Sequence, residues 1–128
     1  MAASGRVAGL RDIVIDTHRP AALARFWASA LDDYEIAPYD DEELARSRAM
    51  GIDSPEDDPG VMLLRVDGAG PRIFLTFFPE PKTMKNRVHV DVTGDHTTLP
   101  TLGAVVVADH DDHVILADPE GNEFRVFP

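Results

Sequence analysis

Cysteine is absent from the 128-residue chain, which excludes a disulfide framework, a thiolate metal site and a cysteine nucleophile. Long hydrophobic segments are also missing, because nowhere do about 18 apolar residues follow one another. The first residues contain no apolar core of the kind that a signal peptide needs. We therefore expect a cytoplasmic protein with no membrane-spanning helix.

Basic residues are few: 12 Lys and Arg stand against 23 Asp and Glu, which gives a formal net charge of -11. This charge repels phosphate backbones and anionic lipids, so we expect neither a nucleic-acid partner nor a membrane partner. Residues 40–60 alone carry eight acidic residues and two arginines. They form either a solvated loop kept polar for solubility or a lid that attracts cations. We expect a short helix over residues 41–50, ended by Gly51.

The length of the chain is that of one domain with a sizeable core. Alternating apolar and polar residues predict a strand over residues 10–16. A helix is predicted over residues 20–31, because its apolar side chains recur at helical spacing. These side chains are Leu23, Phe26, Trp27, Ala30 and Leu31. Further strands are predicted over residues 34–39, 61–66 and 72–78.

The same order of elements then begins again. The second half predicts a strand over residues 87–93, a much shortened helix over 97–102, and strands over 104–108, 113–117 and 123–127. The halves align best when shifted by 77 residues, which sets Asp12 opposite His89. Two βαβββ units that share a core predict an α+β fold. We expect a flexible tail over residues 1–9 and one domain over 10–128, with modules over about 10–80 and 85–128.

Five short segments occur in a fixed order along the chain. They are Asp-Ile-Val-Ile-Asp, Pro-Ala-Ala-Leu-Ala-Arg-Phe-Trp, Lys-Asn-Arg-Val-His-Val-Asp, Leu-Gly-Ala and Asp-Pro-Glu-Gly-Asn-Glu-Phe. With this ordered set the chain resembles the vicinal oxygen chelate superfamily, in its glyoxalase-like and bleomycin-resistance-like branch. The resemblance implies two βαβββ modules in a curved mixed sheet with a concave cleft. It also implies a homodimer, because members often complete their clefts across two chains.

The resemblance further implies four positions at which the best-known members hold a divalent metal. On this chain these positions fall on Asp12, Thr76, His89 and Arg125. Arg125 would repel a divalent ion, and one histidine with one carboxylate is too few ligands for zinc, manganese or iron. We therefore expect no cofactor. The alternative is a divalent metal held by Asp12, His89 and Asp91.

His89 is the candidate for proton transfer. It shares a strand face with Asp91, and the repeat sets Asp12 opposite, so two carboxylates would raise the pKa of its imidazole. We expect Asp12, His89 and Asp91 to be the catalytic residues of a lyase or isomerase that acts on a small carbonyl or carboxylate compound. The alternative role for His89 is structural, as a core histidine satisfied by hydrogen bonds.

Other residues are expected to bind a small-molecule ligand in the cleft. Lys85 and Arg87 stand where a cation would hold a carboxylate, although both also suit surface charges. The expected ligand-binding residues are Thr76, Phe78, Lys85, Arg87 and Arg125. An alternative function is the non-catalytic sequestration of an antibiotic, because an acidic protein with an aromatic cleft suits a cationic drug. The run from Asp118 to Asn122 predicts a hairpin turn.

Overall fold

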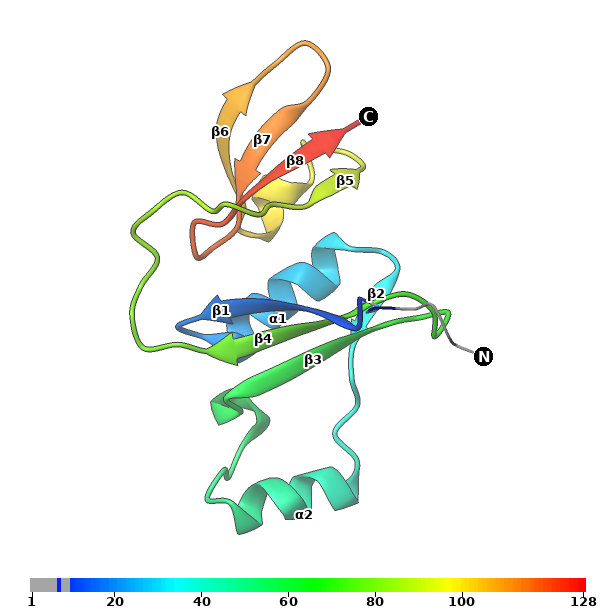
Figure 1. Ribbon diagram of the computed structural model, residues 1–128, viewed down its shortest axis with the longest axis vertical. Coiled ribbons are helices and arrows are strands. Elements are labelled where there is room, and N and C mark those ends of the chain that lie inside the picture. The colour runs from blue at the N-terminus through cyan, green and yellow to red at the C-terminus, as the bar shows by residue number, and fades with distance from the viewer. Residues whose placement is uncertain (1–6, 8–9) are drawn as a thin grey trace.

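The computed structural model describes Val7 and residues 10–128, which fold into two successive modules (Figure 1). Module one contains β1 (Asp12–Thr17), α1 (Pro20–Ala30), β2 (Tyr34–Ile36), α2 (Asp41–Ala49), the 3₁₀ helix η1 (Pro55–Asp57), β3 (Gly60–Arg65) and β4 (Arg72–Phe77). Module two contains β5 (Asp91–Thr93), the 3₁₀ helix η2 (Leu99–Leu102), β6 (Val105–Asp109), β7 (Val114–Ala117) and β8 (Glu123–Phe127). The predicted α+β fold of two modules is confirmed.

The expected tail over residues 1–9 lies outside the described residues, apart from Val7. The predicted domain over residues 10–128 lies wholly within them. In this described part, no helix is both long enough and apolar enough to cross a bilayer.

Each module forms a four-stranded mixed sheet with the same topology. The strand orders are β1-β4-β3-β2 and β5-β8-β7-β6. In both sheets the first strand runs parallel to the last, and the other neighbours are antiparallel. Within the described residues the two sheets stay separate and are not closed onto each other, whereas one curved sheet was expected.

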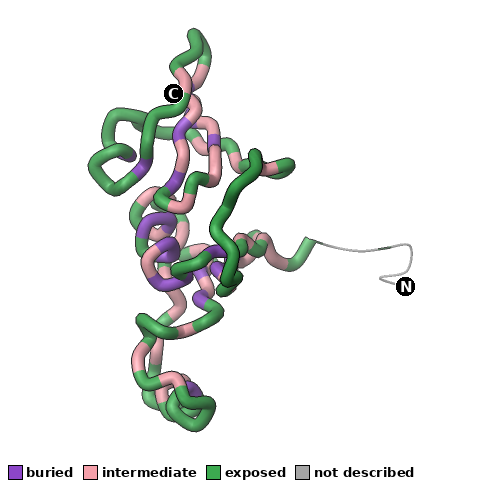
Figure 2. The backbone as a smooth tube through the Cα atoms, turned by 90° about the vertical axis from the view of Figure 1, so that its left-hand side faces the viewer, coloured by how far each residue is buried: buried purple, intermediate pink, exposed green. Residues whose placement is uncertain are grey.

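Helix α1 lies between the two sheets and supplies core side chains to both modules (Figures 1 and 2). Leu23, Phe26 and Trp27 are buried on its apolar face. Trp27 packs edge-on against Phe124 of β8, with ring centroids 4.9 Å apart. Module two contains only η2 as a helix of its own, so its sheet depends on α1 for cover. The predicted apolar face of this helix is therefore confirmed, and its side chains pack in the core that both modules share.

Three predicted elements are longer than the observed ones by two residues or more. The strand expected over residues 87–93 spans only Asp91–Thr93, because residues 79–90 form a largely exposed linker without strand pairing. The helix expected over residues 97–102 is the single 3₁₀ turn η2, which Gly103 ends at φ 120°. The strand expected over residues 34–39 ends at Ile36, two residues before a proline that cannot donate to the ladder.

The shift of 77 residues between the modules agrees with the observed core. It sets Ile13 and Ile15 opposite Val90 and Val92, and all four side chains pack against the core. The Asp–Arg pairs lie at different places in this alignment, because Asp12 stands in register with Arg72 and Asp91 with Arg125. The counterpart of His89 in module one is therefore Asp12, as predicted.

The acidic segment of module one is folded. Asp40 caps α2, since its side chain accepts a hydrogen bond from the backbone N–H of Glu43 at 2.8 Å. Gly51 follows the helix at φ 83°, as predicted. Arg25 of α1 holds the segment through both oxygens of Glu56, at 2.7 and 3.0 Å. Helix α2 lies at the far end of the molecule from module two (Figure 1).

Candidate functional site

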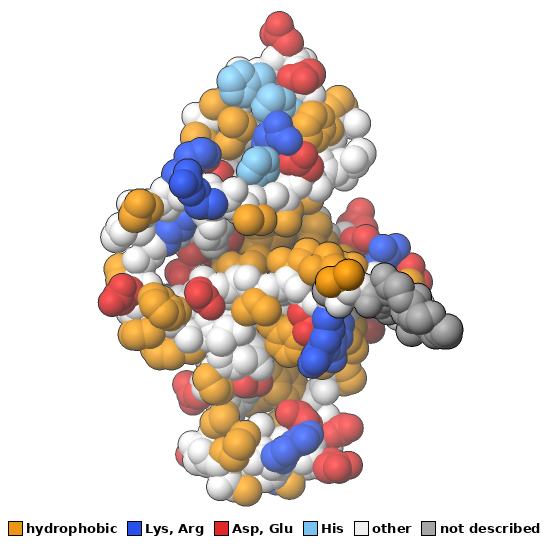
Figure 3. All heavy atoms as spheres, viewed as in Figure 1, with side chains coloured by type: hydrophobic (Ala, Val, Ile, Leu, Met, Phe, Trp, Pro, Cys, Tyr) orange, Lys and Arg blue, Asp and Glu red, His pale blue; other side chains and the backbone are white. Residues whose placement is uncertain are grey.

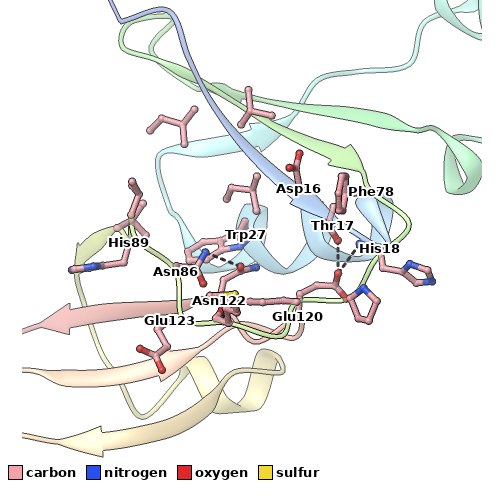
Figure 4. Close-up of a pocket in the computed structure, with 18 of the residues that line it drawn as sticks. Asp16, Thr17, His18, Trp27, Phe78, Asn86, His89, Glu120, Asn122 and Glu123 are labelled. Atoms are coloured by element: carbon pink, nitrogen blue, oxygen red, sulfur yellow. Dashed lines mark hydrogen bonds between the residues drawn. The ribbon is translucent and has the colours of Figure 1, made fainter.

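A cavity of about 430 Å³ opens between the modules (Figure 4). Its walls come from β1, the linker over residues 79–90 and the turn between β7 and β8. Ile13, Ile15 and Trp27 give it an apolar surface, to which Phe78 and Met84 add. This volume lies in the range that accommodates a small organic molecule. No residue of α2 lines the cavity, so the acidic helix is not its lid.

The turn between β7 and β8 is organised by the buried carboxylate of Asp118. Its Oδ1 accepts hydrogen bonds from the backbone N–H groups of Glu120 and Asn122, both at 2.9 Å. Its Oδ2 accepts one from the indole Nε1 of Trp27 at 3.0 Å. Gly121 adopts φ 88°, which favours glycine. The predicted turn is confirmed, and the structure adds that it anchors module two to α1.

Glu120 reaches from this turn to the end of β1. Its Oε1 accepts hydrogen bonds from Thr17 Oγ1 at 2.8 Å and from the backbone N–H of His18 at 2.7 Å (Figure 4). Its Oε2 has no hydrogen-bond partner among the residues that the structure describes. A carboxylate fixed through one oxygen thus lines the cavity, and its other oxygen has no hydrogen-bond partner among the described residues.

Negative charge prevails around the cavity. Five charged side chains line it: Asp16, Glu80, Lys82, Glu120 and Glu123. Glu123 pairs with Lys85, and this ion pair lowers the pKa of the Glu123 carboxyl. Asp16 and Glu80 have no such partner within the described part of the chain. Apart from the Glu123–Lys85 pair, three carboxylates line the cavity with one ammonium, so the local charge favours cations.

Three of the predicted site residues lie together on module two. His89 Nε2 is 3.5 Å from Asp91 Oδ1, and Arg125 donates to both oxygens of Asp91 at 2.8 and 2.7 Å. The hydrogen bonds from Arg125 lower the pKa of Asp91 below its usual value, because they favour the carboxylate. Histidine side chains gather on this module, beside basic and acidic groups (Figure 3). His89 also lines the cavity.

Asp12 does not join this group. Arg72 donates to its two carboxylate oxygens at 2.8 and 3.3 Å, and Arg11 pairs with it at 3.1 Å. Among the described residues, the structure does not gather Asp12, His89 and Asp91 into one cluster. The register of β1 and β4 sets Asp12 beside Arg72 instead.

The remaining predicted residues are scattered. Phe78 lines the cavity, whereas Thr76 stands on β4 opposite Asp16 and Gly60 and does not. Lys85 contacts Glu123 rather than the cavity, and Arg87 is exposed.

A divalent metal does not fit these residues. Over Val7 and residues 10–128, no three His, Cys, Asp or Glu side chains are placed to hold an ion. The carboxylates of Asp12 and Asp91 are each engaged by arginine, and a guanidinium beside a carboxylate opposes a second cation. The geometry therefore does not support the alternative of a metal on Asp12, His89 and Asp91.

Sequence reasoning missed the role of Glu120 and assigned Trp27 to the core alone. Thr17 and Glu120 are 103 residues apart in the sequence, and a local sequence pattern cannot predict a contact between them. The sequence signal near Glu120 was the turn motif that begins at Asp118. That motif predicted a turn and not a ligand site.

Comparison with known proteins gives one match at the level of the family. The model of a glyoxalase-like domain matches residues 12–127. Among curated proteins, none matches the chain in sequence.

Solved structures with a similar fold come from several bacteria. A glyoxalase/bleomycin resistance protein/dioxygenase family enzyme from Burkholderia phytofirmans PsJN is 17% identical with a TM-score of 0.62, over 93% of this chain and 97% of that chain. The fosfomycin resistance protein FosX from Mesorhizobium loti is 12% identical with a TM-score of 0.63, over 95% and 92%. A glyoxalase family protein from Bacillus cereus is 16% identical with a TM-score of 0.55, over 98% and 97%. At these identities the likeness shows the fold alone.

Proposed function

Because the chain belongs to the glyoxalase-like family, we propose that it is a small-molecule-binding protein whose cavity between the modules takes an organic cation. The observation that carries the proposal is Glu120, whose carboxylate is fixed through one oxygen while it lines an otherwise largely apolar wall. The ligand would combine an ammonium group with an apolar or aromatic part.

Two physical effects support this ligand class. An apolar group gains free energy when it leaves water for the surface of Ile13, Ile15 and Trp27. An ammonium gains from a carboxylate that is already held in place, because little side-chain entropy is lost on binding. The protein's net charge of -11 adds long-range attraction for cations.

We propose binding rather than catalysis, because the expected catalytic set is not assembled. His89 has one neighbouring carboxylate, Asp91, and Arg125 already neutralises it. Sequestration of a cationic drug is one form of such binding. The identity of the ligand rests on the chemistry of this cavity, because the fold hosts several functions.

The single tryptophan of the chain gives a direct test, because Trp27 lines the cavity. Its fluorescence is titrated with 2-phenylethylammonium and with 3-phenylpropionate, which pair an aromatic ring with opposite charges. The ammonium probe should bind and the carboxylate probe should not. Binding should weaken as salt rises. Glu120→Gln should weaken it about tenfold, since the amide still accepts from Thr17 and His18 but has no charge.

The matched control is Glu42→Gln, which removes the same charge from an exposed position on α2. It should leave the affinity close to that of the unmodified protein. Equal affinity for the two probes, an affinity independent of salt, or equal effects of Glu120→Gln and Glu42→Gln would each contradict the proposal.

A further inference from the structure

His89 and Asp91 have the spacing of two ligands of one metal ion. His89 Nε2 lies 3.5 Å from Asp91 Oδ1. Two ligands at about 2.0–2.1 Å from a tetrahedral zinc ion are roughly 3.4 Å apart. An imidazole and a carboxylate are also ligand types that zinc and cobalt accept. The pair therefore supplies two of the ligands that a metal site needs. Asp91 is the first residue of β5, and His89 lies two residues before it.

Arg125 binds the carboxylate of this pair. Its Nε and Nη2 donate to the two oxygens of Asp91, and its guanidinium lies 5.4 Å from the ring centroid of Phe127. The fork satisfies both carboxylate oxygens, and its charge neutralises Asp91. The guanidinium also links β8 to the parallel strand β5, as a cation bound between the strands would.

Module one repeats the arrangement with one difference. Arg72 binds Asp12 through the same two nitrogens and lies 5.3 Å from the ring centroid of Phe74. Both pairs join the first strand of a module to its last. Leu10, however, stands two residues before Asp12, where His89 stands two residues before Asp91. Among the described residues, the Asp12–Arg72 pair therefore lacks the histidine that accompanies Asp91 and Arg125.

We propose that Arg125 is a built-in substitute for a metal ion: it holds Asp91 to β8 and keeps divalent metals away from the His89–Asp91 pair. Arg125 is then one local reason why this chain departs from the metal sites that the family resemblance implies. Replacing the guanidinium by a carboxylate removes the repulsion and adds the third ligand that the pair lacks. The inference does not depend on ligand binding in the cavity.

The test is cobalt binding by Arg125→Glu, measured by calorimetry and by elemental analysis after gel filtration. This variant should retain about one equivalent of Co²⁺, whereas the unmodified protein should retain none at the same concentration. The double variant His89→Ala/Arg125→Glu should lose the metal. Arg72→Glu is the matched control in module one, and it should bind no cobalt because Leu10 offers no ligand.

Arg125→Gln is a second variant that still tests the proposal if Arg125→Glu does not fold. It removes the charge without adding a ligand, so it should bind cobalt more tightly than the unmodified protein and at least about tenfold more weakly than Arg125→Glu. Circular dichroism checks each variant for native secondary structure. The inference is overturned if the unmodified protein binds cobalt as tightly as the Arg125 variants, or if Arg72→Glu binds it equally well.

Discussion

The two modules have the same strand order, but they do not contribute equally to the fold. Module one has a first strand of six residues and the 11-residue helix α1. Module two has a first strand of three residues and only the four-residue η2 as a helix. Its buried Phe124 and Asp118 take their partner, Trp27, from α1. A repeated topology therefore does not give two independent folding units.

Trp27 carries the largest expected effect. Trp27→Ala removes the ring that packs on Phe124 and the donor to Asp118, so it should destabilise the protein by about 3–5 kcal/mol. Because both modules share α1, denaturant should still unfold the protein in one transition. Circular dichroism measures this transition, since the variant has no tryptophan fluorescence.

Trp27→Phe is the control that separates packing from hydrogen bonding. It keeps one aromatic ring and loses the indole N–H with a smaller part of the packing than Trp27→Ala, so we expect a loss of about 1–3 kcal/mol. Two separate unfolding transitions, of which these substitutions affect only one, would show that module two folds without α1. The two modules would then be independent folding units.

The Asp–Arg pairs give the second test, since each links the first strand of its module to the last. Arg125→Gln should raise amide hydrogen exchange in β5 more than Arg72→Gln raises it in β1. The reason is ladder length, because β1 is in register with β4 over six residues and β5 with β8 over three. Exchange detected by mass spectrometry compares the two strands in one experiment. Equal increases would mean that ladder length does not decide how strongly each strand depends on its Asp–Arg pair.

The smallest expected effect is a dependence on pH. Arg125 lowers the pKa of Asp91 in the folded protein, so the ion pair adds stability above the ordinary Asp pKa of about 4. That stability is lost as the pH falls through the lowered folded value. The difference in unfolding free energy between the protein and Asp91→Asn should shrink as the pH falls below about 4.

Asp53→Asn is the control for that measurement, since Asp53 is exposed and forms no ion pair within the described residues. Its difference from the unmodified protein should stay small throughout. A difference for Asp91→Asn that persists unchanged into strong acid would show that the Arg125 pair does not stabilise the fold.

Both modules, the glyoxalase-like family and most elements could be predicted from the sequence. Helix α1 shows why: its apolar residues recur at helical spacing, and the turn around Asp118 contains residues that favour turns. Both signals are local. His89, Asp91 and Arg125 were also expected near one another, and the structure brings them together.

The tertiary structure decided the rest, because it depends on contacts between distant residues. Strand alternation predicts the face on which a side chain lies but not its neighbour on the next strand, so only the observed pairing revealed that Arg72 engages Asp12. The same holds for the cavity, where Glu120 meets Thr17 across 103 residues. Composition, periodicity and family could be inferred from the chain alone; register, and with it every charge that meets another across the modules, required the fold.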